Sequence, residues 1–472
     1  MSMVVQHNMQ AANANRMLGV TTSAQSKSTE KLSSGYKINR AADDAAGLTI
    51  SEKMRKQIRG LDKASSNAQD GVSSVQTAEG ALTEVHSMLQ RMNELAVQAA
   101  NGTNSKDTDR KAIQDEIDQL NTEIDRVAET TKFNEIYLLK GDDGEKTINL
   151  NAHDAGLKGT LVDNGSGKAT FTMKELSVGD SVSIGGKNYT IGSTAADAQK
   201  IVTGQEKAGG KVTVNGVEYT YNDTDKKWKD AAGADVQIGT GAAAGKIVIG
   251  DGDKVSDGTT TLTAMTDKKD ATGAAKADGV DDNDNSVISA EKAYSLAKDE
   301  LVAANHIGDT ENTAAVDQDT TNKNVFTITT GSAKVANTLS FSLHVGADAD
   351  MTNKITVDID TMNSANLGIK GLNVTDKNGT AATYAIDAIS DAISKVSSQR
   401  SALGAVQNRL EHTIDNLDNI SENTSSAESR IRDTDMAKEM VNYSKNNILA
   451  QAGQSMLAQA NQSNQGVLSL LQ

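Results

Sequence analysis

Cysteine and proline are both absent from this chain of 472 residues. The lack of cysteine excludes disulfide bonds, thiolate metal sites and cysteine nucleophiles. Proline usually makes up about 5% of a protein, so its absence indicates a chain in which no segment requires a fixed kink. It also means that no slow isomerisation of an X-Pro bond delays folding.

Aromatic residues and long apolar runs are scarce as well. One Trp, four Phe and eight Tyr leave the core to aliphatic side chains and Ala, which suits long helices packed side by side. No run approaches the ~18 apolar residues of a membrane span. The first eight residues lack a basic region followed by an apolar run, so we expect no Sec-type signal peptide. These features fit a cytoplasmic protein and also one exported without a cleavable signal.

The negative charge is concentrated in the middle of the chain. Of the formal charge of −16, residues 141–380 contribute −12, from 35 acidic and 23 basic residues. The two ends are nearly neutral. This distribution predicts a strongly solvated central region, and it argues against nucleic acid as a partner.

The N-terminal zone, residues 1–140, contains a heptad pattern. Apolar side chains recur every seven residues at Met54, Leu61, Ala68, Val75, Leu82, Leu89 and Ala96. Such a repeat predicts a helix over about residues 46–102 that packs along its length against partner helices. A second helix is predicted to begin near Ser105 or Asp107, which are capping residue types.

The C-terminal zone, residues 381–472, repeats the pattern. Its heptad positions are Ile389, Val396, Leu403, Leu410, Leu417, Thr424 and Ile431. Because each predicted helix carries one apolar stripe, we expect the helices of both zones to bury their stripes on each other.

The middle of the chain has the alternation of β-strands. Residues 212–214 and 217–221 flank Asn215-Gly216, a pair that favours a type I′ hairpin turn, and residues 181–184 and 187–191 flank Gly185-Gly186. One helix is predicted near residues 289–304. The expected fold class is α+β, with long antiparallel helices from both termini, a small β-hairpin region and a mainly β domain inserted between them.

The outermost segments differ from the long helices. Residues 1–35 and 437–472 are rich in Ala, Asn, Gln and Ser, and their apolar stripes are thin. Weakly apolar helices are marginal by themselves, so we expect these segments to become helical on assembly. We assign an assembly seam to Val441, Ile448, Ala452, Met456, Leu468 and Leu471.

Motifs of catalysis and metal binding are not found. Asp282 could begin a calcium loop, but Val287 and Ala293 stand where that loop needs Gly and Glu. We interpret this stretch as a solvated loop before a helix. Asp43-Asp44 fits capping and turn formation better than an acid pair. There is no His-Glu-x-x-His, Gly-x-Ser-x-Gly or Walker sequence, so we expect no enzyme activity, cofactor or metal site.

Several longer motifs resemble those of bacterial flagellins, in the same order at both ends. They are LSSGYKIN (32–39), ADDAAGL (42–48), NAQDG (67–71), QTAEGAL (76–82), LGAVQNRL (403–410), QAG (451–453), LAQANQ (457–462) and VLSLL (467–471). The resemblance covers residues 1–140 and 336–472.

The resemblance implies a structural subunit of the flagellar filament that is exported unfolded, polymerises outside the cell and serves motility. Residues 1–45 with 432–472 would form a terminal coiled coil lining the filament channel. Residues 46–160 with 336–431 would form a helical core domain, and residues 161–335 a variable outer domain. The implied partners are other copies of the chain, an export chaperone at the C-terminal segment, the filament cap and the hook–filament junction proteins.

A further implied partner is the animal Toll-like receptor that senses flagellins. The stretch QRMNELAV (90–97) resembles the part of these proteins that the receptor reads. The family's contact positions correspond here to Gln90, Arg91, Leu95, Glu116, Ile389 and Ile393.

Two other functions remain compatible with the sequence. A hook–filament junction protein shares terminal coiled coils, and a secreted adhesin or glycan-binding protein would act through residues 161–335. The motif at residues 32–48 and the ending at residues 467–471 favour the filament subunit.

Overall fold

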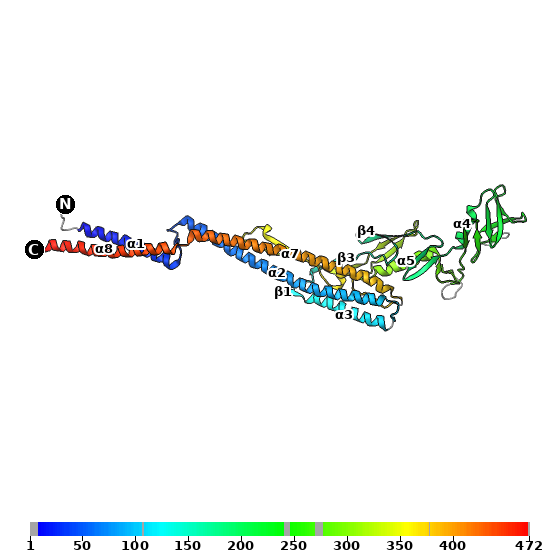
Figure 1. The fold of residues 1–472 in the computed structure, drawn as a ribbon, viewed down its shortest axis with the longest axis horizontal. Coiled ribbons are helices and arrows are strands. Elements are labelled where there is room, and N and C mark those ends of the chain that lie inside the picture. The colour runs from blue at the N-terminus through cyan, green and yellow to red at the C-terminus, as the bar shows by residue number, and fades with distance from the viewer. Residues whose placement is uncertain (1–7, 106–107, 240–245, 270–276, 377, 471–472) are drawn as a thin grey trace. The chain divides into compact units, whose positions relative to one another are not determined.

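The computed structural model describes residues 8–105, 108–239, 246–269, 277–376 and 378–470 (Figure 1). The chain forms two compact units. Unit 1 comprises Met1–Val75, Phe341–Val357 and Gly404–Gln472, and unit 2 comprises Gln76–Ser340 and Asp358–Leu403.

The helices confirm the long helical segments expected at both ends. They are α1 (Met9–Ser34), α2 (Ala45–Ala100), α3 (Asp109–Thr130), α4 (Ala195–Gly204), α5 (Ala290–Asn305), α6 (Ser364–Leu367), α7 (Thr380–Arg432) and α8 (Met436–Leu470), with a 3-10 turn η1 (Met351–Asn353). Helix α3 begins later than predicted, at Asp109; Ser105 lies before it, and Asp107 is outside the described residues. The terminal segments are helical within the single chain, contrary to our expectation that they require assembly.

The heptad positions form the buried faces of the long helices. In α2 the column from Leu61 to Ala96 is buried, with Met54 partly exposed. In α7 the column from Ile389 to Leu417 is buried, and it becomes half-exposed at Thr424 and Ile431. Within unit 1, Leu61 and Ala68 of α2 share a core with Leu410 and Leu417 of α7.

A β-hairpin packs on the helices of unit 1. Its strands are β19 (Leu339–His344) and β20 (Lys354–Ile359). The Nδ2 of Asn67 donates a hydrogen bond of 3.0 Å to the carbonyl oxygen of His344. One helical turn later, a Cβ at Gly71 would collide with Leu343. The NAQDG motif therefore provides the space and the anchor for this hairpin.

A buried arginine holds together three chain segments in unit 2. Arg110, near the start of α3, is 1% exposed. Its guanidinium donates hydrogen bonds to the carbonyl oxygens of Ala99 (2.8 Å), Asn101 (3.1 Å) and Asp376 (3.1 Å). Ala99 lies in the last turn of α2 and Asn101 directly follows the helix, where carbonyls lack helical partners. Arg110 thus caps α2 and fixes the approach to α7.

The strands of the described residues lie in small sheets, as the alternating pattern predicted. The strands not yet given are β1 (Lys132–Phe133), β2 (Ile136–Tyr137), β3 (Asp142–Asn149), β4 (Gly159–Gly165), β5 (Lys168–Met173), β6 (Ser181–Ile184), β7 (Lys187–Ile191), β8 (Lys211–Val214), β9 (Val217–Asn222), β10 (Lys227–Lys229), β11 (Asp235–Gly239), β12 (Lys246–Val248), β13 (Lys254–Ser256), β14 (Thr261–Thr263), β15 (Val287–Ile288), β16 (Ala315–Gln318), β17 (Val325–Thr329) and β18 (Ser332–Asn337).

Strand pairing follows the predicted turns. The sheet orders are β1-β2, β12-β11-β10-β9-β8-β13-β14, β15-β7-β6, β16-β17-β5-β4, β18-β3 and β19-β20. Val214 pairs with Val217 across the turn, and Asn215 and Gly216 both have positive φ, as a type I′ turn requires. Ile184 pairs with Lys187 in the second hairpin.

The inserted β region contains two separate hydrophobic cores. One surrounds Phe171, Phe326 and Leu301, the last from α5. The other surrounds Trp228 and Val202. Val202 belongs to α4, a helix that we did not predict. A capping box between Thr194 and Asp197 begins α4, and this S/T-x-x-D pattern was the sequence signal for it.

We expect replacement of Arg110 by alanine to lower the free energy of unfolding by about 3 kcal/mol or more, because one buried and two partly buried carbonyls lose their donor. Urea denaturation of the monomeric protein, followed by circular dichroism, measures the change. Lys111→Ala provides the matched control, since this neighbouring side chain is 65% exposed and its loss should change stability by less than about 0.5 kcal/mol. Equal stability of the two variants would contradict the capping role of Arg110.

Candidate assembly surface

Helices α1 and α8 pair along their length in unit 1 (Figure 1). The Nδ2 of Asn8, the N-cap of α1, donates to the carbonyl oxygen of Ala460 at 3.1 Å. Further along, Leu18 packs beside Gly453. At the other end, Thr434 N–H donates to the carbonyl oxygen of Gly35 at 3.0 Å. The order of these contacts shows that the two helices run antiparallel.

The contact between the two helices is narrow. A row of partly or fully shielded α8 positions follows a spacing of three and four residues: Glu439, Tyr443, Asn446, Ala450, Gly453, Leu457 and Ala460, with Asn447 beside it. Within the pair, only Ser28 and Ala450 are buried among the residues whose burial is described. Small and polar side chains allow the backbones to approach closely, but they bury little apolar area.

Three of the larger apolar side chains of α8 face away from α1. Val441 is 67% exposed, Ile448 66% and Met456 65%, and Ala452 is exposed between them. With about 3.6 residues per turn, these four residues lie on the side of α8 opposite to the shielded row. We call them the outer stripe. Of the remaining predicted seam residues, Leu468 lies in α8 where side chains are not described, and Leu471 lies outside the described residues.

Helix α1 repeats this arrangement. Its Met9 and Val20 are both largely exposed and lie opposite to the face that contacts α8. Exposed apolar residues gathered on one surface indicate an interaction site rather than isolated surface residues. Burying each large side chain of the outer stripe would contribute about 1.5–3 kcal/mol.

A fixed joint connects this helix pair to the rest of unit 1. The guanidinium of Arg432 lies 4.8 Å from the ring centre of Tyr36, and its Nη1 lies 2.6 Å from Glu52 Oε1. The hydrogen bond from Arg432 lowers the pKa of the Glu52 carboxyl below its ordinary value. Lys37 N–H donates to the carbonyl oxygen of Arg432 at 2.6 Å. Gly35 ends α1 with φ of +77°, which a residue with a side chain rarely adopts.

The acidic pair in the connecting segment has the capping role that the sequence predicted. Asp43 Oδ2 accepts hydrogen bonds from the backbone N–H groups of Arg40 and Asn39, which lower its pKa. Asp44 Oδ1 accepts from Gly47 N–H at 2.8 Å, at the start of α2. Within the described ranges, no group of three or more His, Asp or Glu side chains is placed to hold a metal ion.

The residues assigned to receptor recognition do not form one exposed surface. Gln90, Arg91 and Glu116 are exposed, whereas Leu95 is 2% exposed and Ile389 0%. The burial of Ile389 follows from heptad packing, because it belongs to the buried column of α7. Ile393 is half-buried.

Arg91 is the centre of the exposed part. Its Nε lies 2.9 Å from Glu116 Oε1 on α3, and its Nη1 lies 3.2 Å from Glu94 Oε2 one turn along α2. The hydrogen bond from Glu116 raises the pKa of Arg91 above its ordinary value. Glu94 and the exposed Val97 also belong to this surface and were not among the predicted residues.

None of the helices in the described ranges is long and apolar enough to cross a membrane.

Comparison with known proteins gives matches at both ends and over the whole chain. The family models for the bacterial flagellin N-terminal helical region and C-terminal helical region match residues 5–143 and 386–471. A flagellin of Clostridium tyrobutyricum is 38% identical, over 98% of this chain and 100% of the relative. Flagellin C of Vibrio cholerae serotype O1 is 36% identical over 100% of both chains.

Two solved structures show a more distant likeness. FliC from Burkholderia pseudomallei is 19% identical, with 72% of this chain and 99% of that chain covered and a TM-score of 0.27. Flagellar hook associated protein-3 from Legionella pneumophila is 14% identical, with 80% and 98% covered and a TM-score of 0.32. Likeness at these TM-scores supports no structural argument.

We expect the two faces of α8 to respond differently to an introduced charge. Ala450→Asp places a carboxylate in the contact with α1 and should destabilise the helix pair by about 1–3 kcal/mol. Ile448→Asp makes the same kind of change on the outer stripe and should alter monomer stability by less than about 0.5 kcal/mol. Amide hydrogen exchange of α8 in the monomeric protein measures both. Faster exchange in Ile448→Asp than in Ala450→Asp would reverse the assignment of the faces.

Proposed function

The chain belongs to the bacterial flagellin family, the structural subunits of the flagellar filament, and we propose that the paired helices α1 and α8 form its assembly surface. The observation that carries this proposal is the outer stripe, defined above as Val441, Ile448, Ala452 and Met456. A monomer leaves this stripe in water, whereas neighbouring copies in a polymer can bury it. Each copy presents the same surface, so burial repeats along a growing filament.

We further propose a division of labour along the chain. Residues 1–45 with 432–472 would line the filament channel, and residues 46–160 with 336–431 would form the surrounding helical domain. Residues 161–335 would face outward, in keeping with the negative charge of the central region. No residue is assigned a catalytic role.

Export in an unfolded state is the route that best suits this sequence. A chain without cysteine or proline forms no disulfide and waits for no X-Pro isomerisation, so it can fold quickly after passage through a channel. We propose that an export chaperone binds the C-terminal segment before secretion and covers the apolar side chains of α8. Cap and junction proteins would contact the same terminal helices at the ends of the filament.

A second proposed function is recognition by a host flagellin-sensing Toll-like receptor. The exposed charges of Arg91 and Glu116, with Gln90 beside them, are available to a partner on the monomer. We omit Leu95 and Ile389 from the direct contacts because both side chains are buried. Glycan binding through residues 161–335 remains an alternative additional role, which binding of that region to a glycan array would reveal.

We expect deletion of residues 437–472 to leave a soluble monomer that does not polymerise. The sharper test is Ile448→Asp, which should also abolish polymerisation because a carboxylate cannot be buried in the seam without a partner. Gln451→Asp is the matched control, since it adds the same charge at an exposed polar position on the flank of α8. Electron microscopy and sedimentation after seeding measure filament formation. Normal filaments from Ile448→Asp would exclude the outer stripe as the seam.

For the receptor, we expect Arg91→Glu to weaken binding of the monomer by about tenfold or more, corresponding to loss of about 1.4 kcal/mol or more from a charged contact. Surface plasmon resonance with the purified receptor ectodomain provides the measurement. Lys111→Glu reverses a charge on the exposed face of α3 and serves as the control. Unchanged affinity of Arg91→Glu would remove Arg91 from the proposed contact.

A further inference from the structure

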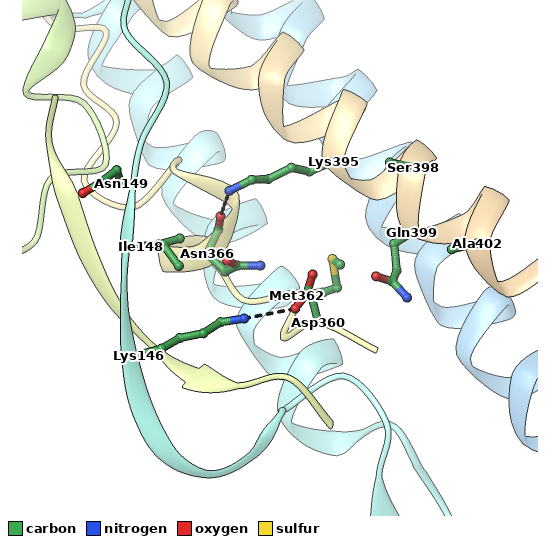
Figure 2. Close-up of a pocket in the computed structure, with 10 residues that line it drawn as sticks. All are labelled: Lys146, Ile148, Asn149, Asp360, Met362, Asn366, Lys395, Ser398, Gln399 and Ala402. Atoms are coloured by element: carbon green, nitrogen blue, oxygen red, sulfur yellow. Dashed lines mark hydrogen bonds and ion pairs between the residues drawn. The ribbon is translucent and has the colours of Figure 1, made fainter. Parts of the chain in front are cut away.

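A cavity of about 370 Å³ in unit 2 contains two lysines in contrasting environments. Its walls come from β3, from the segment after β20 and from α7, as Figure 2 shows. Lys146 enters from β3 and Lys395 from α7. The assembly surface lies in unit 1, so the roles argued above do not account for this cavity.

Lys146 is paired with a carboxylate. Its Nζ lies 3.2 Å from Asp360 Oδ1 and donates a hydrogen bond of 2.7 Å to Thr338 Oγ1. Thr338 Oγ1 also donates to Asp360 Oδ1 at 2.6 Å. Burial raises the pKa of Asp360, but the hydrogen bonds from Thr338 and Lys146 outweigh this effect and lower it overall. The Asp360 carboxylate therefore favours its ionised form beside the Lys146 side chain.

Lys395 has no such partner. Its half-buried side chain crosses the cavity, and its Nζ donates to the carbonyl oxygen of Asn366 at 2.7 Å (Figure 2). No carboxylate among the described residues forms an ion pair with it. A carbonyl oxygen can accept a hydrogen bond from an ammonium and also a weaker one from a neutral amine.

The surroundings make Lys395 easier to deprotonate than an ordinary lysine. Burial lowers the pKa of Lys395 below its ordinary value; Asp360 and Asp391 offset part of this effect, and the charge of Lys146 adds to it. The Asp391 carboxylate interacts with other residues: it accepts a hydrogen bond of 2.8 Å from Asn151 Nδ2 and lies 4.0 Å from His153 Nε2. A desolvated lysine that loses its proton readily is a nucleophile.

We propose that Lys395 is a site of N-acylation by small acyl phosphates. The lone pair of the neutral Nζ attacks the acyl carbonyl carbon and forms a C–N bond. The C–O bond to the phosphate breaks, and the phosphate leaves with that electron pair. The proton lost from Nζ ends on hydrogenphosphate or in solvent, so atoms and charge balance with an amide and phosphate as products.

The product suits the cavity better than the charged side chain does. The amide retains one N–H that can donate to the carbonyl oxygen of Asn366. Acylation removes a half-buried positive charge and its repulsion with Lys146, while the ion pair between Lys146 and Asp360 is kept. The cavity has space for a short acyl chain, and the open side admits the donor.

Competitive acetylation of the folded full-length monomer tests the proposal. The protein is treated with trace acetyl phosphate between about pH 6.5 and 9.5, and peptide mass spectrometry gives the rate at each lysine. At pH 7 we expect Lys395 to react at least about threefold faster than the exposed Lys111. As pH rises, the rate at Lys395 should reach its plateau at a lower pH than the rate at Lys111 does. Lys146, in the same cavity, should react more slowly than both. Equal or slower reaction of Lys395, or reaction only after unfolding in urea, would overturn the proposal.

Two substitutions provide an independent readout. Lys395→Gln removes the charge but retains an N–H donor, so we expect its urea midpoint to equal or exceed that of the unchanged protein. Lys146→Gln leaves the half-buried Asp360 carboxylate without its cation and should lower the midpoint. If Lys395→Gln lowers the midpoint as much as Lys146→Gln does, Lys395 is needed as an ammonium and the proposal fails. Neither readout involves polymerisation, so failure here leaves the assembly proposal untouched.

Discussion

The pairing of the two ends of the chain along heptad seams is the constraint on which the other features depend. Leu61 and Ala68, early in the chain, share a core with Leu410 and Leu417, almost 350 residues later. Because the ends must meet, everything between them is an insertion. The hairpin β19–β20 is fixed to the same core through Asn67 and Gly71.

The seam changes in strength between the long helices and the terminal helices. Large aliphatic side chains are buried between α2 and α7, whereas between α1 and α8 only Ser28 and Ala450 are buried and residues such as Leu18 and Leu457 are partly shielded. In the terminal pair the larger residues, such as Val441 and Ile448, are placed on the outside. A helix pair of this composition buries only part of its apolar surface within its own chain. The remaining apolar surface is available to other copies. The same periodicity thus supports folding of the chain in α2 and α7, and association between copies in α1 and α8.

Much of this could be predicted from local patterns. The heptads of α2 and α7, and the turns at Asn215-Gly216 and Gly185-Gly186, depend on periodicity and on the φ values that Gly and Asn tolerate. Helix α4 was missed because it is short, although the Thr194–Asp197 capping box marked its start. Leu95 and Ile389 were assigned to a surface by resemblance, but the packing of unit 2 buries them. A resemblance assigns roles to matching positions in the sequence, but it does not show which side of a helix is covered by a neighbouring helix.

The sequence by itself determined that this chain is a flagellin, that both ends form long helices and that a β region lies between them. These properties are written in motifs and repeats of a few to seven residues, which act locally. Only the tertiary structure decided which stripes face one another, that Arg110 bridges α2 and the segment before α7, and that Lys395 meets a carbonyl group where Lys146 meets a carboxylate. The physical reason is that burial, pairing and charge depend on groups brought together from hundreds of residues apart, and no local pattern specifies them.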